Sequence, residues 1–162
     1  RAIGPKLAEQ LAYIRGSVDG DRVGPSREGI ELLVGGLSGQ AFSRMARYAD
    51  GYAHGGGPPR AFASAAARAE AAWRDLGRPG RPRLWGQGYF SFGDVERGNA
   101  YLRDYYAFTG PFAERIVAEN LTSSRAVKDF VRGYEEAGCD ELVLFPNVAD
   151  AEELDRLMEA LS

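Results

Sequence analysis

The sequence has little that would support a disulfide or a metal site. It contains one cysteine, Cys139, and one histidine, His54. A single cysteine cannot form an internal disulfide, and one histidine with one cysteine cannot supply the clustered ligands of a structural zinc site. A disulfide scaffold and a zinc-finger-like protein are therefore excluded. The low cysteine count fits a reducing compartment, and we expect a cytoplasmic protein.

The sequence also lacks long apolar runs and a strong charge of one sign. The longest stretch without a charged residue, 32–43, has 12 residues, whereas a membrane-spanning helix needs about 20. The net charge is −3 and the pI is about 5.3, so no basic field attracts nucleic acid or an anionic membrane. The first residue is Arg1, and no charged-then-apolar signal segment follows it. We expect neither a membrane nor a nucleic acid as a partner.

What is present is the composition of an ordinary globular domain. The chain has 162 residues, of which 44% are hydrophobic and 27% are charged. That length holds one domain with a core and is short for two. We therefore predict a single domain over residues 1–162.

Helices and strands alternate along the predicted pattern. Apolar residues recur at helical spacing in several segments, and short apolar runs bounded by glycine or proline separate them. The predicted helices cover 6–15, 39–49, 59–76, 95–107, 111–119 and 124–137, with a last helix capped by Asp150. The predicted strands cover 30–34, 50–54, 83–92 and 141–145, and 17–29 is a predicted loop. The first and last of these strands read as buried strands.

Particular residues mark the predicted element ends and faces. Ser38 is a good N-cap, and Gly77 and Gly138 are suited to stop helices. Gly86 and Gly88 inside a strand indicate a close approach of another segment. In the last helix Glu153 stands at the position of a capping-box partner for Asp150. Its predicted apolar stripe is Leu154, Leu157, Met158 and Leu161.

The order of these elements indicates an α/β fold. Strands that alternate with helices imply a parallel sheet with right-handed crossovers. A complete (β/α)8 barrel takes about 250 residues, or roughly 31 for each βα unit. Four parallel βα units with a leading helix fill 162 residues, so we predict half of a (β/α)8 TIM barrel.

One turn has the composition of an anion site. Gly35, Gly36, Leu37, Ser38 and Gly39 end a predicted strand and open a helix. The first N–H groups of a helix have no helical partner, and the helix dipole adds partial positive charge there. A phosphate would fit, with Ser38 offering a hydroxyl. The residues alone slightly favour a tight βα turn with an ordinary serine cap.

Further candidates follow the other predicted strands. His54 has the pKa range of an acid–base group, although a histidine in a glycine-rich loop is more often solvated, and Asp50 more often orients a loop. Gln87, Tyr89 and Ser91 alternate on the third strand, and we expect them to face the barrel interior. The candidates for contact with a substrate are Gln87, Tyr89 and Asn147, which follows the fourth strand. Trp85 and Phe90 could also contact a ligand, but aromatic residues in strands are more often core.

A basic loop invites comparison with an AT-hook. Residues 77–83 read Gly-Arg-Pro-Gly-Arg-Pro-Arg, but Pro79 stands where an arginine should precede Gly80. A loop between a helix and a strand explains these residues better than a minor-groove contact.

The order and spacing of several motifs resemble the luciferase-like monooxygenase family. Residues 33–38 (Leu-Val-Gly-Gly-Leu-Ser) are followed by 46–52 (Ala-Arg-Tyr-Ala-Asp-Gly-Tyr). The segments 121–123 (Leu-Thr-Ser) and 136–144 (Glu-Ala-Gly-Cys-Asp-Glu-Leu-Val-Leu) are similar to the family's last helix and strand. The resemblance covers residues 30–161 and assigns them to the C-terminal half of the barrel, so the family's first four strands have no counterpart.

The resemblance implies a flavin-dependent oxidoreductase or monooxygenase. It favours FMN or a deazaflavin as the cofactor, with its phosphate at the 35–39 turn, and a small molecule as the substrate. Because a half barrel leaves edges and a core face open, we expect a homo-oligomer or pairing with the missing N-terminal half. Two alternatives remain: a catalytically incomplete assembly module, and another phosphate-binding TIM-barrel enzyme.

Overall fold

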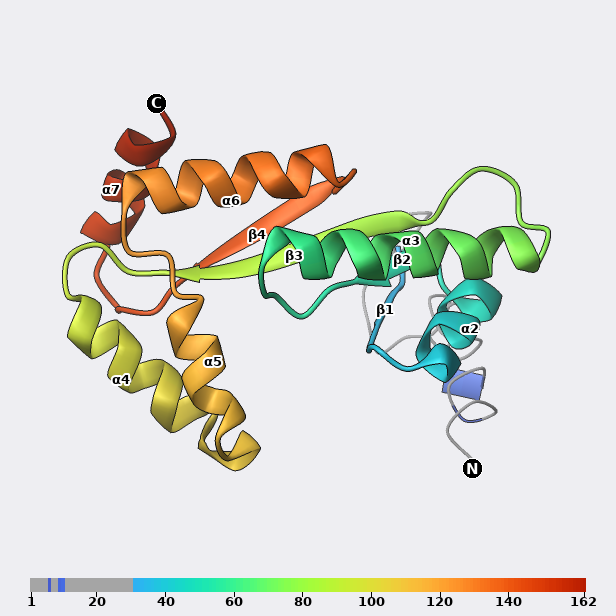
Figure 1. Ribbon diagram of the computed structural model, residues 1–162, viewed down its shortest axis with the longest axis horizontal. Helices are drawn as coiled ribbons and strands as arrows, with labels where there is room; N and C mark the ends of the chain where they lie inside the picture. Colours follow the sequence, from blue (N-terminus) through green and yellow to red (C-terminus); the bar gives the residue numbers. More distant parts are fainter. Residues whose placement is uncertain (1–5, 7–8, 11–30) are drawn as a thin grey trace, which may run out of the picture. The chain divides into compact units, whose positions relative to one another are not determined.

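The computed structural model describes residue 6, residues 9–10 and residues 31–162 (Figure 1). Of the predicted helix 6–15, only Lys6, Glu9 and Gln10 are described, and all three are helical. The predicted loop 17–29 and the start of the first predicted strand, Ile30, lie outside the described residues. From residue 31 the elements are β1 (Leu33–Gly35), α2 (Gly39–Tyr48), β2 (Gly51–Ala53), α3 (Pro59–Asp75), β3 (Arg83–Phe90), α4 (Val95–Tyr105), η2 (Ala107–Thr109), α5 (Phe112–Ala118), α6 (Ser124–Glu136), β4 (Glu141–Pro146) and α7 (Glu152–Leu161).

The four strands form one parallel sheet in the order β1-β2-β3-β4. Leu33 lies opposite Gly51 in the β1–β2 pair, and Trp85 lies opposite Glu141 in the β3–β4 pair. At least one helix follows each strand, as in successive βα units. The predicted α/β class with four parallel βα units is confirmed.

The chain packs as two compact units, which are described separately. The first contains β1, α2, β2 and the part of α3 from Arg68, and continues to Arg83. The second contains residues 54–67 and everything from Leu84 onward. The prediction of a single domain over residues 1–162 stays a prediction.

In the first unit, α2 forms as its sequence predicts. The Ser38 hydroxyl accepts a hydrogen bond of 3.2 Å from the Ala41 amide and caps the helix. Four apolar residues that recur at helical spacing are all buried, namely Phe42, Met45, Ala46 and Ala49. At the other end, the Arg78 guanidinium donates to the carbonyls of Ala46 and Ala49, at 3.0 and 2.6 Å. Arg78, the first basic residue of the AT-hook-like loop, therefore caps a helix within the fold.

An aspartate immediately before a strand joins that strand to its neighbour, once in each unit. Asp50 donates its N–H to the Leu32 carbonyl at 2.8 Å, and its carboxylate accepts from the Leu32 N–H at 2.9 Å. Asp140 makes the same two bonds with Leu84, both at 2.8 Å. The sequence favours Asp50 as a residue that orients a loop, and in the structure its carboxylate joins the segments that lead into β1 and β2. Both aspartates lie at the amino ends of the strands, away from the end where barrel enzymes bind their ligands.

In the second unit, side chains of helix α6 pack against strand β3. Leu84, Gly86, Gly88 and Phe90 alternate as buried residues on one face of the strand. A Cβ at Gly88 would lie 2.8 Å from the Phe130 ring, and one at Gly86 would overlap the ring of Tyr134. The close approach predicted from the strand glycines is therefore confirmed, and α6 is the segment that makes it.

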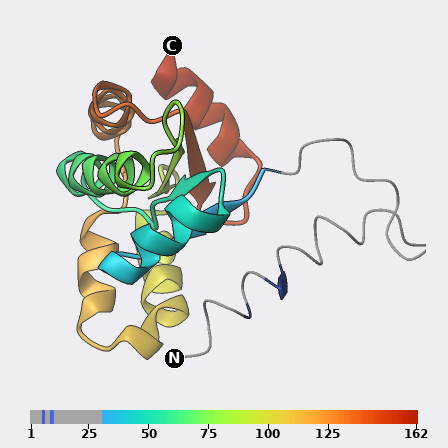
Figure 2. The same cartoon turned by 90° about the vertical axis from the view of Figure 1, so that its right-hand side faces the viewer.

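Helices α4 and α5 lie side by side (Figures 1 and 2). The Asp94 carboxylate caps α4 by accepting from the Arg97 N–H at 3.0 Å. This helix ends at Tyr105 rather than at the predicted residue 107, because residues 107–109 tighten into the 3-10 turn η2. Gly110 then adopts φ 61°, a left-handed conformation that suits glycine, and it allows the chain to turn into α5.

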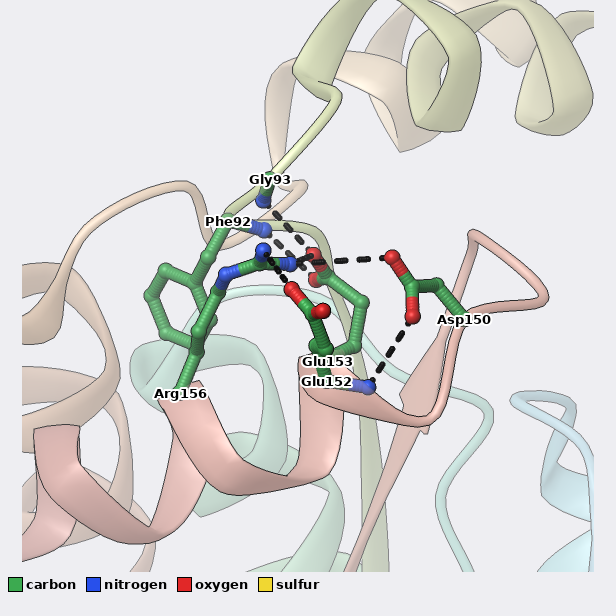
Figure 3. Close-up of polar contacts among 6 residues, drawn as sticks. All are labelled: Phe92, Gly93, Asp150, Glu152, Glu153 and Arg156. Atoms are coloured by element: carbon green, nitrogen blue, oxygen red, sulfur yellow. Dashed lines mark hydrogen bonds and ion pairs between the residues drawn. The ribbon is translucent and has the colours of Figure 1, made fainter.

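The predicted capping box of α7 is wrong (Figure 3). The Glu153 side chain does not cap its own helix. Its carboxylate is fully buried and accepts the N–H groups of Phe92 and Gly93, at 2.7 and 2.6 Å. The Arg156 guanidinium donates to the same carboxylate at 2.9 Å. The helix N-cap is Ala151, while Asp150 accepts from the Glu152 N–H at 3.0 Å.

The hydrogen bonds of the Glu153 carboxylate determine which face of α7 is buried. Leu157 is buried as predicted, together with Glu153 and Ala160. The other three residues of the predicted stripe are exposed, to 54% for Leu154, 66% for Met158 and 41% for Leu161.

The two strands predicted to be buried are only half-buried. Strand β1 has three residues, of which Leu33 and Val34 are half-buried and Gly35 is exposed. The three middle residues of β4 are half-buried, and its other three are exposed. Neither strand therefore has the two covered faces expected of a central strand in a complete α/β sheet. None of the described helices is long and apolar enough to cross a membrane.

Candidate functional site

The predicted anion site lies in an exposed turn of the first unit. β1 ends at Gly35, and α2 begins at Gly39. Gly36 has φ 115°, a conformation that side chains rarely adopt, and a Cβ there would lie 3.0 Å from that of Ala41. At Gly39 a Cβ would meet nothing within 4 Å, so space lies beside the first turn of the helix. The residue between them, Leu37, is 64% exposed. The turn thus presents backbone N–H groups to its surroundings.

An arginine that the sequence analysis missed lies beside this turn. The Arg68 Nη1 donates to the Leu37 carbonyl at 3.0 Å, and its guanidinium carbon lies 4.4 Å from the centre of the Phe42 ring. This arrangement holds a permanent positive charge at the amino end of α2, where the first turn contains no acidic residue. No local pattern could have revealed it, because Arg68 is 31 positions from Leu37 and belongs to α3.

His54 is buried in the second unit, so the expectation that it is solvated is wrong. The residue is 5% exposed, and its ring contacts Phe62 edge-on at 5.7 Å between centres. Phe62 stacks in turn on Tyr134 of α6 at 4.5 Å. Burial lowers the pKa of His54, and a hydrogen bond with the Gly56 backbone offsets part of that shift. The ring is therefore neutral near pH 7 and packed among helix side chains, and its catalytic role stays a prediction.

Gln87 and Tyr89 lie on the half-exposed face of β3, together with Trp85. This is the face opposite to the one that packs on α6. The Gln87 amide donates to the Gly55 carbonyl at 3.1 Å and so fastens the loop that follows β2. Phe90, considered with Trp85 as a ligand contact, is fully buried on the α6 face instead.

The Tyr89 hydroxyl forms a hydrogen bond of 2.5 Å with the hydroxyl of Tyr106, the C-cap residue of α4. Burial is the main cause that raises the pKa of Tyr89, and the bond to Tyr106 adds to it. Tyr89 thus remains a neutral phenol throughout the physiological pH range. The strand pattern predicts Tyr89 as a candidate, whereas the helical spacing of Tyr106 favours a packing role over a chemical one.

Asn147 is part of a buried polar cluster at the carboxyl ends of β3 and β4. Its Nδ2 donates to the Asn120 Oδ1 at 2.8 Å, and the Asn120 Nδ2 donates to the Ser91 hydroxyl at 2.8 Å and to the Asn99 Oδ1 at 2.9 Å. All but Asn99 are fully or almost fully buried. The cluster joins the segments that follow the two strands, so Ser91 and Asn147 meet there through Asn120 rather than beside Tyr89.

The described residues contain no cluster of side chains suited to bind a metal ion. No group of three or more histidine, cysteine, aspartate or glutamate side chains lies in an arrangement that could hold a metal ion there.

The sequence matches no protein-family model and no curated protein. Its fold is nevertheless similar to that of several solved structures. An F420-dependent secondary alcohol dehydrogenase in complex with an F420-acetone adduct aligns over 97% of this chain with a TM-score of 0.71 and 13% identity. The coenzyme F420 dependent tetrahydromethanopterin reductase from Methanopyrus kandleri aligns over 91%, with a TM-score of 0.55 and 13% identity. Apo-MsnO8 aligns over 97%, with a TM-score of 0.60 and 18% identity.

At these identities the similarity establishes the fold. The chain spans 60%, 58% and 60% of the length of the three structures. It therefore has the α/β architecture of part of a (β/α)8 barrel, as the sequence predicts, and the luciferase-like family stays a prediction.

Proposed function

We propose that this chain is part of a deazaflavin-dependent oxidoreductase of the luciferase-like type, and that it binds the cofactor's phosphate at the 35–39 turn. The observation that carries the proposal is the combination of this turn with the guanidinium of Arg68. Both belong to the first unit, and both lie at the carboxyl end of β1, where barrel enzymes bind their ligands.

The residues present fit a phosphate. Gly36 and Gly39 leave the backbone of the turn accessible, and the N–H groups that begin α2 favour an anion. The Ser38 hydroxyl accepts from Ala41 and still has its own proton to donate. Arg68 adds a charge-assisted donor. Because Arg68 also donates to Leu37, the guanidinium is already oriented before an anion arrives.

The choice of a deazaflavin is supported by the fold. Two structures that share it are described as F420-dependent, an alcohol dehydrogenase and a tetrahydromethanopterin reductase. A bound deazaflavin would supply hydride transfer, and the protein's part would be to bind and orient it. FMN as the cofactor, the use of oxygen and a cytoplasmic location stay predictions.

A fluorescence titration with coenzyme F420 tests this function. We expect saturable binding that inorganic phosphate weakens by competition. Arg68→Gln should weaken binding about tenfold, since it removes a charge-assisted hydrogen bond. Arg60→Gln is the matched control, because Arg60 is an exposed arginine in the first turn of the same helix, and it should bind as the unchanged chain does.

Gly36→Val gives a second variant at the turn itself. It should abolish binding, since a β-branched residue at φ 115° distorts the turn and approaches Ala41. Thermal unfolding of each variant separates lost binding from lost folding. Absence of binding by the unchanged chain, or equal loss in the Arg68 and Arg60 variants, would contradict the proposal. A preference for FMN or for a sugar phosphate would identify a different cofactor or a different phosphate-binding barrel enzyme.

A second candidate function is an assembly module. β4 ends the strand order, and its Phe145 is 42% exposed, so an edge and an apolar side chain of the described sheet are open to a partner. Light scattering coupled to size exclusion tests whether the chain forms a homo-oligomer. A monodisperse monomer would argue against this candidate.

A further inference from the structure

We propose that the paired hydroxyls of Tyr89 and Tyr106 bind the carbonyl or hydroxyl oxygen of a small apolar molecule. In the oxidoreductase proposed above, on which this assignment of a substrate class rests, that molecule would be a ketone, an aldehyde or an alcohol. The site lies wholly within the second unit, so its geometry is described without reference to the rest of the chain.

The two hydroxyls meet at the carboxyl end of the sheet. Tyr89 is the last residue but one of β3 and lies on the half-exposed face of that strand. Tyr106 follows the last turn of α4. Their ring centres are 6.0 Å apart at 68°, and their oxygens are 2.5 Å apart. Two separate elements therefore bring the hydroxyls together at the end of a barrel strand, where ligands of this architecture bind.

One hydroxyl proton of the pair remains available for a hydrogen bond to a ligand. A phenol has one O–H donor and also accepts. One of the two protons is used in the bond between the oxygens, whichever tyrosine donates it. Among the described residues the two hydroxyls have no other partner, so the second proton remains to be donated. A hydroxyl that accepts a bond while donating another is a stronger donor, because linked hydrogen bonds polarise one another.

The surroundings of the pair are aromatic. The Tyr89 ring lies 5.9 Å from that of Phe145, which stands opposite it on β4. The Tyr106 ring lies 4.9 Å from Tyr105 and 6.1 Å from Phe108. Phe108 is 81% exposed, and Phe145 and Tyr105 are also exposed. Exposed aromatic residues around one polar group are typical of a surface that binds an apolar molecule and orients it by a single hydrogen bond.

The Tyr89 hydroxyl stays protonated. Burial and the bond to Tyr106 both raise the pKa of Tyr89, so this phenol keeps its proton across the range in which most enzymes work. A ligand oxygen, which accepts, is therefore a better match than an ammonium or another donor. This distinguishes the site from the 35–39 turn, whose arginine and helix terminus select a full negative charge.

Binding of acetophenone and of α-methylstyrene tests the proposal. The two molecules have nearly the same shape, but a C=O group in the first replaces a C=CH2 group in the second. We expect the unchanged chain to bind acetophenone about tenfold more tightly in an NMR titration, the ratio that one net hydrogen bond supplies. The infrared C=O stretch of the bound ketone should also move to lower frequency than in an apolar solvent.

Tyrosine variants identify the donors. Either tyrosine alone can still donate its proton, so Tyr89→Phe and Tyr106→Phe should each retain part of the preference for the ketone. The double variant should bind both molecules equally and should bind α-methylstyrene as the unchanged chain does, since both rings remain. Tyr101→Phe is the matched control: its ring stacks on Tyr105, but its hydroxyl lies outside the pair, and the full preference should persist.

Three outcomes would overturn the proposal. They are equal affinity of the unchanged chain for the two molecules, a preference that survives in the double variant, and no binding of either. The titration contains no cofactor, so it is independent of the F420 experiment. Loss of F420 binding with an intact ketone preference would refute the oxidoreductase, and the reverse result would refute only the tyrosine site.

Discussion

Asp140 and Leu84 exchange two hydrogen bonds across 56 positions of sequence: the Asp140 N–H donates to the Leu84 carbonyl, and the Asp140 carboxylate accepts from the Leu84 N–H. The bond from the Leu84 N–H to the Asp140 carboxylate continues the ladder between β3 and β4, with a side-chain oxygen in place of a backbone carbonyl. Asp50 does the same with Leu32 in the first unit. An edge N–H that would otherwise need water is thereby satisfied inside the protein.

Removing the Asp140 carboxylate should destabilise the fold. We expect Asp140→Ala to lower the free energy of unfolding by about 1–3 kcal/mol, because the Leu84 amide loses its acceptor. Asp140→Asn, which keeps an oxygen at the same position, should cost less. Urea denaturation followed by far-UV circular dichroism measures both. Asp75→Ala, at an exposed aspartate with no such bond, should have almost no effect, and an equal loss in that control would contradict the explanation.

The Glu153 carboxylate should be the most sensitive single group of α7. Glu153→Ala leaves the Phe92 and Gly93 amides without their acceptor and removes one anionic partner of Arg156. Breaking a buried charged network of this kind costs about 3 kcal/mol. Glu153→Gln should cost less, since its one oxygen can still accept. The melting temperature reports both, and Glu159→Ala, exposed on the same helix, should leave it unchanged.

Gly86 should not accept even one methyl group. A Cβ at this position would overlap the Tyr134 ring, which is itself fully buried. We expect Gly86→Ala to destabilise the chain by about 1–3 kcal/mol through overpacking. Gly55→Ala is the control, because a Cβ there meets nothing within 4 Å and the residue does not need a positive φ. A Gly86 variant as stable as the control would show that α6 can move away from β3.

His54 should make stability depend on pH below neutrality. Burial lowers its pKa in the folded state, so the unfolded chain, with an ordinary value near 6.5, takes up the proton first as the pH falls. Stability is therefore full above about pH 6.5 and declines below it, until the folded-state pKa is passed. Urea denaturation between pH 7.5 and about 5 should show this decline. His54→Gln should flatten it, and an unchanged slope in the variant would contradict the assignment to the only histidine in the chain.

Much of the fold follows from local spacing, and the exceptions have identifiable causes. Helical periodicity predicts the buried face of α2, whose alanine, phenylalanine and methionine side chains are all buried. In α7 the same rule selected Leu154 and Met158, which are exposed. The rotation of that helix is set by Glu153, whose carboxylate is held by the amides of Phe92 and Gly93. Hydropathy alone cannot predict that a charged residue will be buried by a loop 60 positions away.

The candidate site likewise contains residues that the local sequence predicts and residues that only the folded structure brings together. The glycines and Ser38 of the 35–39 turn are adjacent in sequence, so their pattern was visible. Arg68 and Tyr106 meet their partners, the Leu37 carbonyl and the Tyr89 hydroxyl, only in the folded chain, 31 and 17 positions away in sequence. His54 was expected in solvent because its neighbours are glycines, but Phe62 covers its ring.

The reactivity of the Cys139 thiol can be used to follow changes in structure at the start of β4. Its thiol is half-buried and lies against the Leu84 and Glu141 carbonyls, and burial raises its pKa. Only the thiolate reacts readily with disulfide reagents, so labelling is slow while β3 and β4 remain paired. Since the chain has no other cysteine, modification by a coloured disulfide reagent reports on this position alone, and its rate should rise under conditions that loosen the pairing of β3 and β4, without any introduced label.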